Sequence, residues 1–138
     1  YLSIILKFEK QIINISSNIE YAYYIGYSYY KIHYFKESIK LLNMYLKNIE
    51  LLQDYDSAHH LENVSTTLNI LSIIFMEEED YPKAIQYALK AKDILQKKGL
   101  TKSRTYFVVI NNLGGFYNRI SDYEKCISLL EEFLSYNK

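Results

Sequence analysis

Three copies of one short pattern decide the fold of this chain: Phe35-Lys-Glu-Ser38-Ile39, Tyr81-Pro-Lys-Ala84-Ile85 and Tyr123-Glu-Lys-Cys126-Ile127. Each copy has an aromatic residue, a small residue three positions later, and then isoleucine. Nine positions before each aromatic lies another small residue, which a further aromatic follows at three positions: Gly26 and Tyr29, Ser72 and Phe75, Gly114 and Tyr117. A pattern that recurs at this length scale indicates a repeat architecture, in which each unit buries its apolar face against its neighbours.

Around these copies, apolar and small residues recur at the spacing of one helix face. We therefore predict a first helix in each of the stretches 19–33, 61–77 and 105–119. A second helix follows in each unit, and its apolar stripe starts at the aromatic of the pattern: Phe35, Ser38, Ile39, Leu42 and Tyr45, then Tyr81, Ala84, Ile85, Ala88 and Ala91, then Tyr123, Cys126, Ile127, Leu130 and Phe133. Residues 2–16 read as a further helix, so the sequence predicts seven helices and no strand.

Turn and capping signals set the boundaries of the predicted units. Asp80 and Asp122 suit helix N-caps, because a carboxylate there accepts from the free N–H groups of the first turn. Ser57 or Asp56 suits the same role further upstream, and Gly99 suits the position after a helix end. We predict one all-α domain, 1–138, with the tail of a preceding repeat at 1–18 and repeats at 19–56, 57–100 and 101–138. A start at tyrosine suggests a fragment of a longer chain.

Composition excludes several classes of function. The 138 residues carry 16 Lys plus Arg and 16 Asp plus Glu, so the net charge is zero and the basic surface of a nucleic-acid-binding domain is not expected. The single cysteine rules out an internal disulfide framework and fits a reducing compartment, so we expect a cytoplasmic location. No apolar run is long enough for a transmembrane helix, and we expect no membrane association.

The repeated residues resemble tetratricopeptide (TPR) repeats over roughly residues 19–138. The small residue, the aromatic three later, the next aromatic six later and the Ala-like position are matched three times. The early Trp of the motif is replaced by Ala22, Leu68 and Ile110, its late Pro is absent, and 46 and 42 residues separate the copies against the usual period of about 34. The resemblance implies a right-handed superhelix of antiparallel helix pairs, a TPR-like α-solenoid.

The longer repeats are similar to those of the peptide-pheromone receptors of Gram-positive bacteria (the Rap, NprR, PlcR and Rgg group). In that group the array binds a short re-imported peptide, and most members carry an N-terminal DNA-binding domain. The resemblance implies the ligand-sensing domain of a bacterial transcriptional regulator in quorum sensing. It also implies that the first helices line the concave surface, which selects these candidate peptide-binding residues: Tyr23, Tyr27, Tyr30, Asn69, Ile73, Asn111, Asn112, Gly115, Asn118 and Arg119.

The chemistry of these residues fits a peptide ligand. An asparagine amide pairs with both the N–H and the C=O of an extended backbone, and Asn69 and Asn111 occupy equivalent positions. Gly115 lets a ligand backbone approach, and Arg119 suits a C-terminal carboxylate. Tyrosine supplies contact area with few rotatable bonds. Since the chain holds 16 tyrosines, packing against a neighbouring repeat is an equally good reading of the tyrosine stripe.

Nothing in the sequence predicts an enzyme, a cofactor or a metal site. His59 and His60 are expected to point in different directions from the start of a helix, without a third ligand. Cys126 replaces an Ala-like core residue, so a buried inert thiol is expected. The alternative to peptide sensing is a constitutive protein-protein interaction or dimerisation scaffold, a homodimer whose tyrosine-rich face is buried. The peptide, the partner and the oligomeric state are not encoded in any motif.

Overall fold

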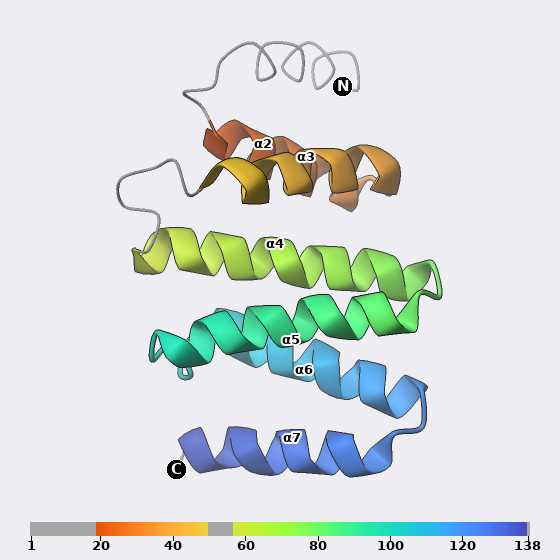
Figure 1. Ribbon diagram of the computed structural model, residues 1–138, viewed down its shortest axis with the longest axis vertical. Coiled ribbons are helices and arrows are strands. Elements are labelled where there is room, and N and C mark those ends of the chain that lie inside the picture. The colour runs from red at the N-terminus through yellow and green to blue at the C-terminus, as the bar shows by residue number, and fades with distance from the viewer. Residues whose placement is uncertain (1–18, 50–56, 138) are drawn as a thin grey trace. The chain divides into compact units, whose positions relative to one another are not determined.

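The computed structural model describes residues 19–49 and 57–137, and all regular elements in those ranges are helical. The α-helices are α2 (Ile19–Lys31), α3 (Phe35–Asn48), α4 (Ala58–Glu77), α5 (Tyr81–Lys97), α6 (Arg104–Arg119) and α7 (Tyr123–Tyr136) (Figure 1). The predicted all-α class is confirmed for these residues, and the helix expected at 2–16 lies outside them. No helix that the structure describes is long and apolar enough to span a bilayer.

The chain divides into two compact units, residues 1–60 and 61–138. In the first unit, α2 and α3 pack against each other. In the second, each helix runs back along the one before it, in the order α4, α5, α6 and α7 (Figure 1). Each predicted second helix begins at the aromatic of the repeated pattern.

The same turn joins the two helices of each pair. In each turn, the second residue after the first helix adopts a left-handed conformation, with φ of 64° at His33 and 63° at both Glu79 and Ser121. The N–H of the following residue then donates back across the turn at 2.9 Å, in the pairs Tyr34 to Tyr29 O, Asp80 to Phe75 O and Asp122 to Tyr117 O. This is the Schellman motif, which satisfies carbonyl groups that the helix end leaves without partners. The repeat is therefore visible in the backbone itself.

The capping residues predicted from the sequence take up their expected roles. Asp80 accepts from the backbone N–H of Lys83, and Asp122 accepts from that of Lys125, each at 3.3 Å. The hydroxyl of Ser57 accepts from the N–H of His60 at 3.4 Å, so Ser57 is the residue that caps α4. Gly99, with φ of 70°, ends α5 in the left-handed conformation that favours glycine.

Small residues bring the paired helices close together, as the repeated pattern predicts. In the first unit the Ser38 hydroxyl donates to the carbonyl of Gly26 at 2.8 Å, which links α3 directly to the backbone of α2. In the last pair, a Cβ added to Gly114 would lie 4.0 Å from the Cys126 sulfur. The partly buried thiol of Cys126 thus sits at the contact between α6 and α7.

The apolar stripe predicted for α7 is wrong in its orientation. The residue of α7 that is buried is Leu129, while Tyr123, Ile127 and Leu130 of the predicted stripe are exposed. The corresponding positions of α5 are buried or partly buried because α5 contacts helices on two sides, α4 through the stacked rings of Phe75 and Tyr87, and then α6. Among the described residues, α7 has α6 as its main neighbour.

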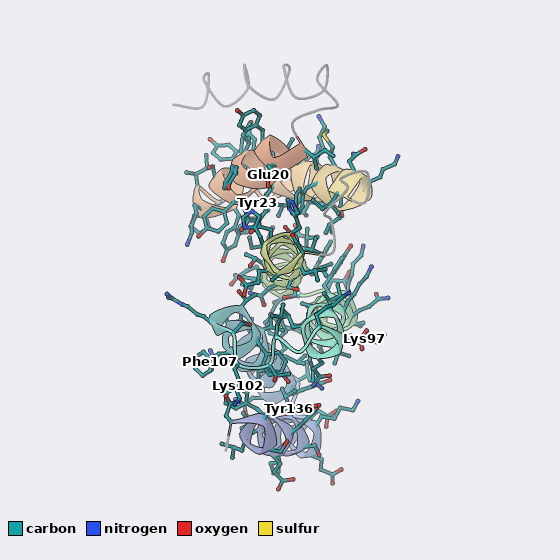
Figure 2. The ribbon with its side chains drawn as sticks, turned by 90° about the vertical axis from the view of Figure 1, so that its left-hand side faces the viewer. Glu20, Tyr23, Lys97, Lys102, Phe107 and Tyr136 are labelled. Carbon is teal, nitrogen blue, oxygen red and sulfur yellow. The ribbon has the colours of Figure 1, made fainter. Side chains whose placement is uncertain are left out.

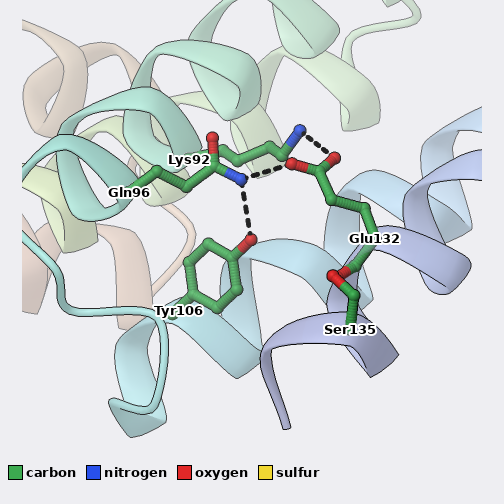
Figure 3. Close-up of polar contacts among 5 residues, drawn as sticks. All are labelled: Lys92, Gln96, Tyr106, Glu132 and Ser135. Atoms are coloured by element: carbon green, nitrogen blue, oxygen red, sulfur yellow. Dashed lines mark hydrogen bonds and ion pairs between the residues drawn. The ribbon is translucent and has the colours of Figure 1, made fainter.

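Polar and aromatic side chains join the C-terminal part of α5, the start of α6 and the C-terminal part of α7. Gln96 donates its amide to the Tyr106 hydroxyl at 3.0 Å and to Glu132 Oε1 at 2.6 Å, and Lys92 bonds Glu132 Oε2 at 2.8 Å (Figure 3). The hydrogen bond from Lys92 lowers the pKa of Glu132, and burial raises the pKa of Tyr106 against the opposing bond from Gln96. Beside this network, the ring of Tyr106 contacts Phe133 and Tyr136, and Phe107 contacts Phe133. Figure 2 labels two of these residues, Phe107 of α6 and Tyr136 of α7.

Candidate functional site

A cavity of about 790 Å³ opens in the unit 61–138, between α4, α6 and α7. This volume falls within the range of about 300–1,000 Å³ that is typical of ligand pockets. Six of the ten predicted peptide-binding residues line it: Ile73, Asn111, Asn112, Gly115, Asn118 and Arg119. The other lining residues are Met76 and Glu77 of α4, Gly114 and Phe116 of α6, and Cys126 and Leu130 of α7.

Asparagine amides form the polar part of the cavity wall. Asn111 and Asn118 are both exposed and lie seven residues apart on α6, which places them about two turns from each other on one face. Asn112 is half-buried between them and the helix α4. Each free amide offers two donors and an acceptor with two lone pairs. The wall can therefore satisfy both kinds of polar group in a ligand backbone.

Asn69 lies beneath this wall and not on it. Its side chain is only 6% exposed, and its Oδ1 accepts a hydrogen bond of 3.1 Å from the Asn112 amide. The side-chain nitrogen of Asn112 therefore points toward α4. The side-chain oxygen of Asn112 is left without a hydrogen bond in the described part of the chain. Asn69 thus holds Asn112 in one orientation, and any effect of Asn69 on a ligand in this cavity runs through Asn112.

Gly115 leaves the middle of the cavity wall without a side chain. A Cβ added there would meet no atom within 4 Å, whereas a Cβ on its neighbour Gly114 would touch Leu129 at 3.8 Å. The two adjacent glycines therefore differ in their surroundings, because Gly114 faces the packed helix α7 and Gly115 faces open space. A ligand backbone can approach α6 closely at Gly115.

Opposite charges lie at the ends of the two helices that flank the cavity. Glu77 is the last residue of α4 and Arg119 the last residue of α6, and both are exposed. Neither makes a salt bridge within the residues that the structure describes. The Arg119 guanidinium is favourably placed near the negative end of the α6 dipole, and it remains available to an anionic group.

The three predicted tyrosines belong to the unit 1–60 and are not among the residues that line this cavity. The ring of Tyr23 contacts the rings of Tyr27 and Tyr45, at centroid distances of 6.4 and 5.4 Å, and Tyr30 stacks on Phe35 at 6.4 Å. Tyr27 is the exposed member, with Tyr23 and Tyr30 half-buried. These contacts belong to packing within the α2–α3 pair. A role of the three tyrosines in ligand binding stays a prediction.

His59 and His60 do not diverge as expected from their adjacent positions. Their ring centroids lie 5.1 Å apart, and His59 Nε2 and His60 Nδ1 each lie 3.6 Å from the same oxygen of Glu20, at the start of α2. Three such side chains can in principle hold a metal ion. However, both histidines belong to the first turn of α4, where the positive end of the helix dipole opposes a cation. We therefore assign no metal to this group.

Sequence reasoning missed the part of the cavity that α7 contributes. The spacing of Cys126 and Leu130 predicts core positions, and the TPR resemblance places ligand-binding residues on the first helices of the repeats alone. The helical spacing does predict Met76 and Glu77 as groove-facing residues, since they continue the face of α4 on which Ile73 lies. No protein-family model matches the chain, and neither the curated proteins nor the solved structures contain a significant match to it.

Proposed function

We propose that the unit 61–138 binds a short linear peptide in the cavity between α4, α6 and α7. The observation that supports this most strongly is the line of Asn111, Gly115 and Asn118 along one face of α6. An extended peptide presents an N–H and a C=O at every residue, and asparagine amides can pair with both. The bare backbone at Gly115 leaves room for the peptide chain between the two amides.

The rest of the lining suits peptide side chains and a terminus. Ile73 and Leu130 offer apolar surface, and the buried residues Met76 and Phe116 complete the apolar part of the wall. Arg119 suits the C-terminal carboxylate of a peptide that ends at the edge of the cavity. These contacts require no catalytic group, so the proposed activity is binding without chemistry.

We further infer that the helix pairs belong to a TPR-like right-handed superhelix. The three equal turns and the small-residue contacts between paired helices support this inference. In such a superhelix the first helices line the concave side, and the two first helices α4 and α6 do contribute most of the cavity wall. Membership in a cytoplasmic transcriptional regulator that senses a peptide pheromone is a proposal that rests on the resemblance of the repeats alone.

The test is a selection of short random peptides on the purified protein, followed by calorimetry of the enriched peptides on variants. Gly115→Leu fills the cavity from a position with open space, so we expect it to weaken binding by about tenfold or more while the fold persists. Asn111→Ala and Asn118→Ala should each weaken binding by a smaller factor, because each removes one hydrogen-bonding amide.

Lys90→Leu is the matched control. It adds the same side chain to an exposed position of α5 that does not line the cavity, and binding should be unchanged. Thermal unfolding of each variant, followed by circular dichroism, separates lost binding from lost structure. The proposal fails if no peptide is enriched, or if enriched peptides bind Gly115→Leu as tightly as the wild-type protein.

A second candidate function is a dimerisation scaffold that uses the tyrosine-rich face of α2. Tyr21 and Tyr24 are each more than half exposed there, at 54% and 52%, and large exposed aromatic side chains are typical of protein interfaces. Sedimentation of the wild-type protein and of Tyr24→Ser tests this function. A tight dimer that becomes monomeric on this substitution would favour the scaffold, and a monomeric wild-type protein would exclude it.

A further inference from the structure

Two side chains of opposite charge border the same end of the cavity in the unit 61–138. Glu77 is the last residue of α4 and Arg119 the last residue of α6, and both line the cavity. The two helices run in the same direction (Figure 1), and the hydrogen bond from Asn112 to Asn69 holds them side by side. The cavity therefore ends between a carboxylate on α4 and a guanidinium on α6.

Glu77 is unfavourably placed in its own helix. The C-terminus of a helix is the negative end of the dipole, which favours a basic residue there, and α6 has Arg119 at this position. The last turn of α4 contains no basic residue. Glu77 is exposed and makes no salt bridge with the residues that the structure describes. A cation bound in the cavity at this end would therefore be attracted by both Glu77 and the α4 dipole.

The line of polar groups on α6 determines which chemical group of a peptide reaches this end. Asn111, Gly115 and Asn118 lie along the cavity wall, and Arg119 comes directly after them. A peptide whose backbone follows this wall brings its terminus to Arg119, so the terminus there is the carboxylate, because an N-terminal ammonium group would be repelled. The side chain of the last residue can then point away from α6 toward α4.

Glu77 restricts that last side chain. A carboxylate that pairs with Arg119 also approaches Glu77, which repels it. A positive charge on the same peptide residue offsets this repulsion, since it can pair with Glu77 while the carboxylate pairs with Arg119. Lysine and arginine carry their charge at the end of a long flexible stem, which suits a residue that must contact two helices at once.

We propose that the cavity selects peptides that end in lysine or arginine with a free carboxylate, and that Glu77 is the residue that makes this selection. This inference rests on the peptide-binding function proposed above and adds the class of peptide. Asn111 and Arg119 are eight residues apart, which is about 12 Å along α6. An extended chain covers that length with about four residues, so the last four or so residues of the peptide make the contacts.

The probes are two pools of N-acetylated random peptides, about six residues long, that differ in their fixed last residue. One pool ends in lysine and the other in norleucine, an uncharged residue of similar length, and both keep a free carboxylate. Each enriched sequence is then synthesised with both endings, and binding to the full chain is measured by fluorescence anisotropy at low salt, because salt screens exposed charges. We expect the lysine ending to bind about tenfold more tightly than the norleucine ending.

Glu77→Gln should remove this preference, because it weakens binding of the lysine ending and leaves binding of the norleucine ending nearly unchanged. Arg119→Gln should weaken binding of both endings, as should amidation of the peptide carboxylate. The matched control is Glu78→Gln, which makes the same change at the next residue. Glu78 is exposed and does not line the cavity, so the preference for lysine should remain.

The outcomes separate this inference from the function on which it rests. Peptides that bind the wild-type chain, lose affinity on Gly115→Leu and yet show no preference for lysine would overturn the selection by Glu77 and leave peptide binding intact. Equal effects of Glu77→Gln and Glu78→Gln would also overturn it, because the attraction would then come from the whole acidic segment. If neither pool yields a binding peptide, peptide binding itself is refuted and this selection with it.

Discussion

The side-chain amide of Asn112 donates a hydrogen bond of 3.1 Å to Asn69 Oδ1, which ties the cavity wall on α6 to the interior of α4. The two residues have different surroundings, since Asn69 is buried and Asn112 is half-buried at the cavity. An amide held by a buried partner cannot rotate freely, so a ligand meets it in a fixed orientation. This preorganisation lowers the entropy cost of binding at Asn112.

Asn69→Ala should destabilise the protein by about 1–2 kcal/mol, because it removes this hydrogen bond from a buried position. It should also weaken peptide binding, since Asn112 loses its fixed orientation. Urea unfolding measures the first effect and calorimetry with an enriched peptide measures the second. Asn111→Ala is the control, and its exposed position should hold the change in unfolding free energy within about 0.5 kcal/mol. Equal destabilisation by both substitutions would contradict this assignment.

The equivalent glycines Gly26 and Gly114 should respond to alanine in opposite ways. A Cβ on Gly26 would lie 2.8 Å from a Leu42 methyl carbon and 3.3 Å from Leu41 Cβ, so overpacking should cost about 1–3 kcal/mol. At Gly114 the nearest contacts are 3.8 and 4.0 Å, which are ordinary, and alanine should add up to about 1 kcal/mol through its higher helix propensity. Thermal unfolding of the two variants checks this, and a shift in the same direction for both would refute it.

Glycine at the left-handed turn positions should stabilise the chain. Ser121 adopts φ of 63°, a conformation that costs an ordinary residue about 1–2 kcal/mol. Glycine removes this cost, but its larger conformational entropy in the unfolded state offsets part of the stabilisation. We expect Ser121→Gly to raise the free energy of unfolding by about 0.5–1 kcal/mol. Gly99→Ala, at φ of 70°, is the reverse experiment and should destabilise by a similar amount. Chemical denaturation that finds no difference in sign between the two would disprove the argument.

Lowering the pH should reduce the free energy of unfolding of the wild-type protein more than that of its Glu132→Gln variant. The hydrogen bond from Lys92 lowers the pKa of Glu132, so the folded state favours the ionised carboxylate. The resulting stabilisation is present above the unfolded-state pKa of about 4.3 and is lost as the pH falls through the lower folded-state pKa. Since the side chain is 37% exposed, the effect should stay below about 1 kcal/mol. The free energies of unfolding of the two proteins should therefore converge as the pH falls from about 6 to about 3. A constant difference over this range would rule out the contribution of Glu132.

The helices and their ends could be predicted from the sequence because local chemistry determines them. Asp80, Asp122, Ser57 and Gly99 each act within one turn of the chain, and their roles follow from hydrogen bonds to nearby backbone. Ser38 opposite Gly26 was also predictable, since the repeated pattern places small residues at both positions.

The orientation of α7 and the bond between Asn112 and Asn69 could not be predicted in the same way. An apolar residue at helical spacing turns inward only if another element covers it, and no local signal states whether that element is present. Ile127 therefore looks the same in the sequence as Ile85, although Ile127 is exposed and Ile85 is partly buried. The pairing of two amides from α4 and α6 likewise depends on how the helices rotate about their own axes.

The turns at His33, Glu79 and Ser121 have a consequence for how such a chain can change over generations. Their geometry is held by backbone hydrogen bonds, and three chemically unlike side chains occupy the one left-handed position. Mutation can therefore alter the residue on each turn without altering the angle between the helices that it joins. A segment that runs from one such turn to the next could be duplicated or exchanged, so new binding surfaces can arise while the turns keep their geometry.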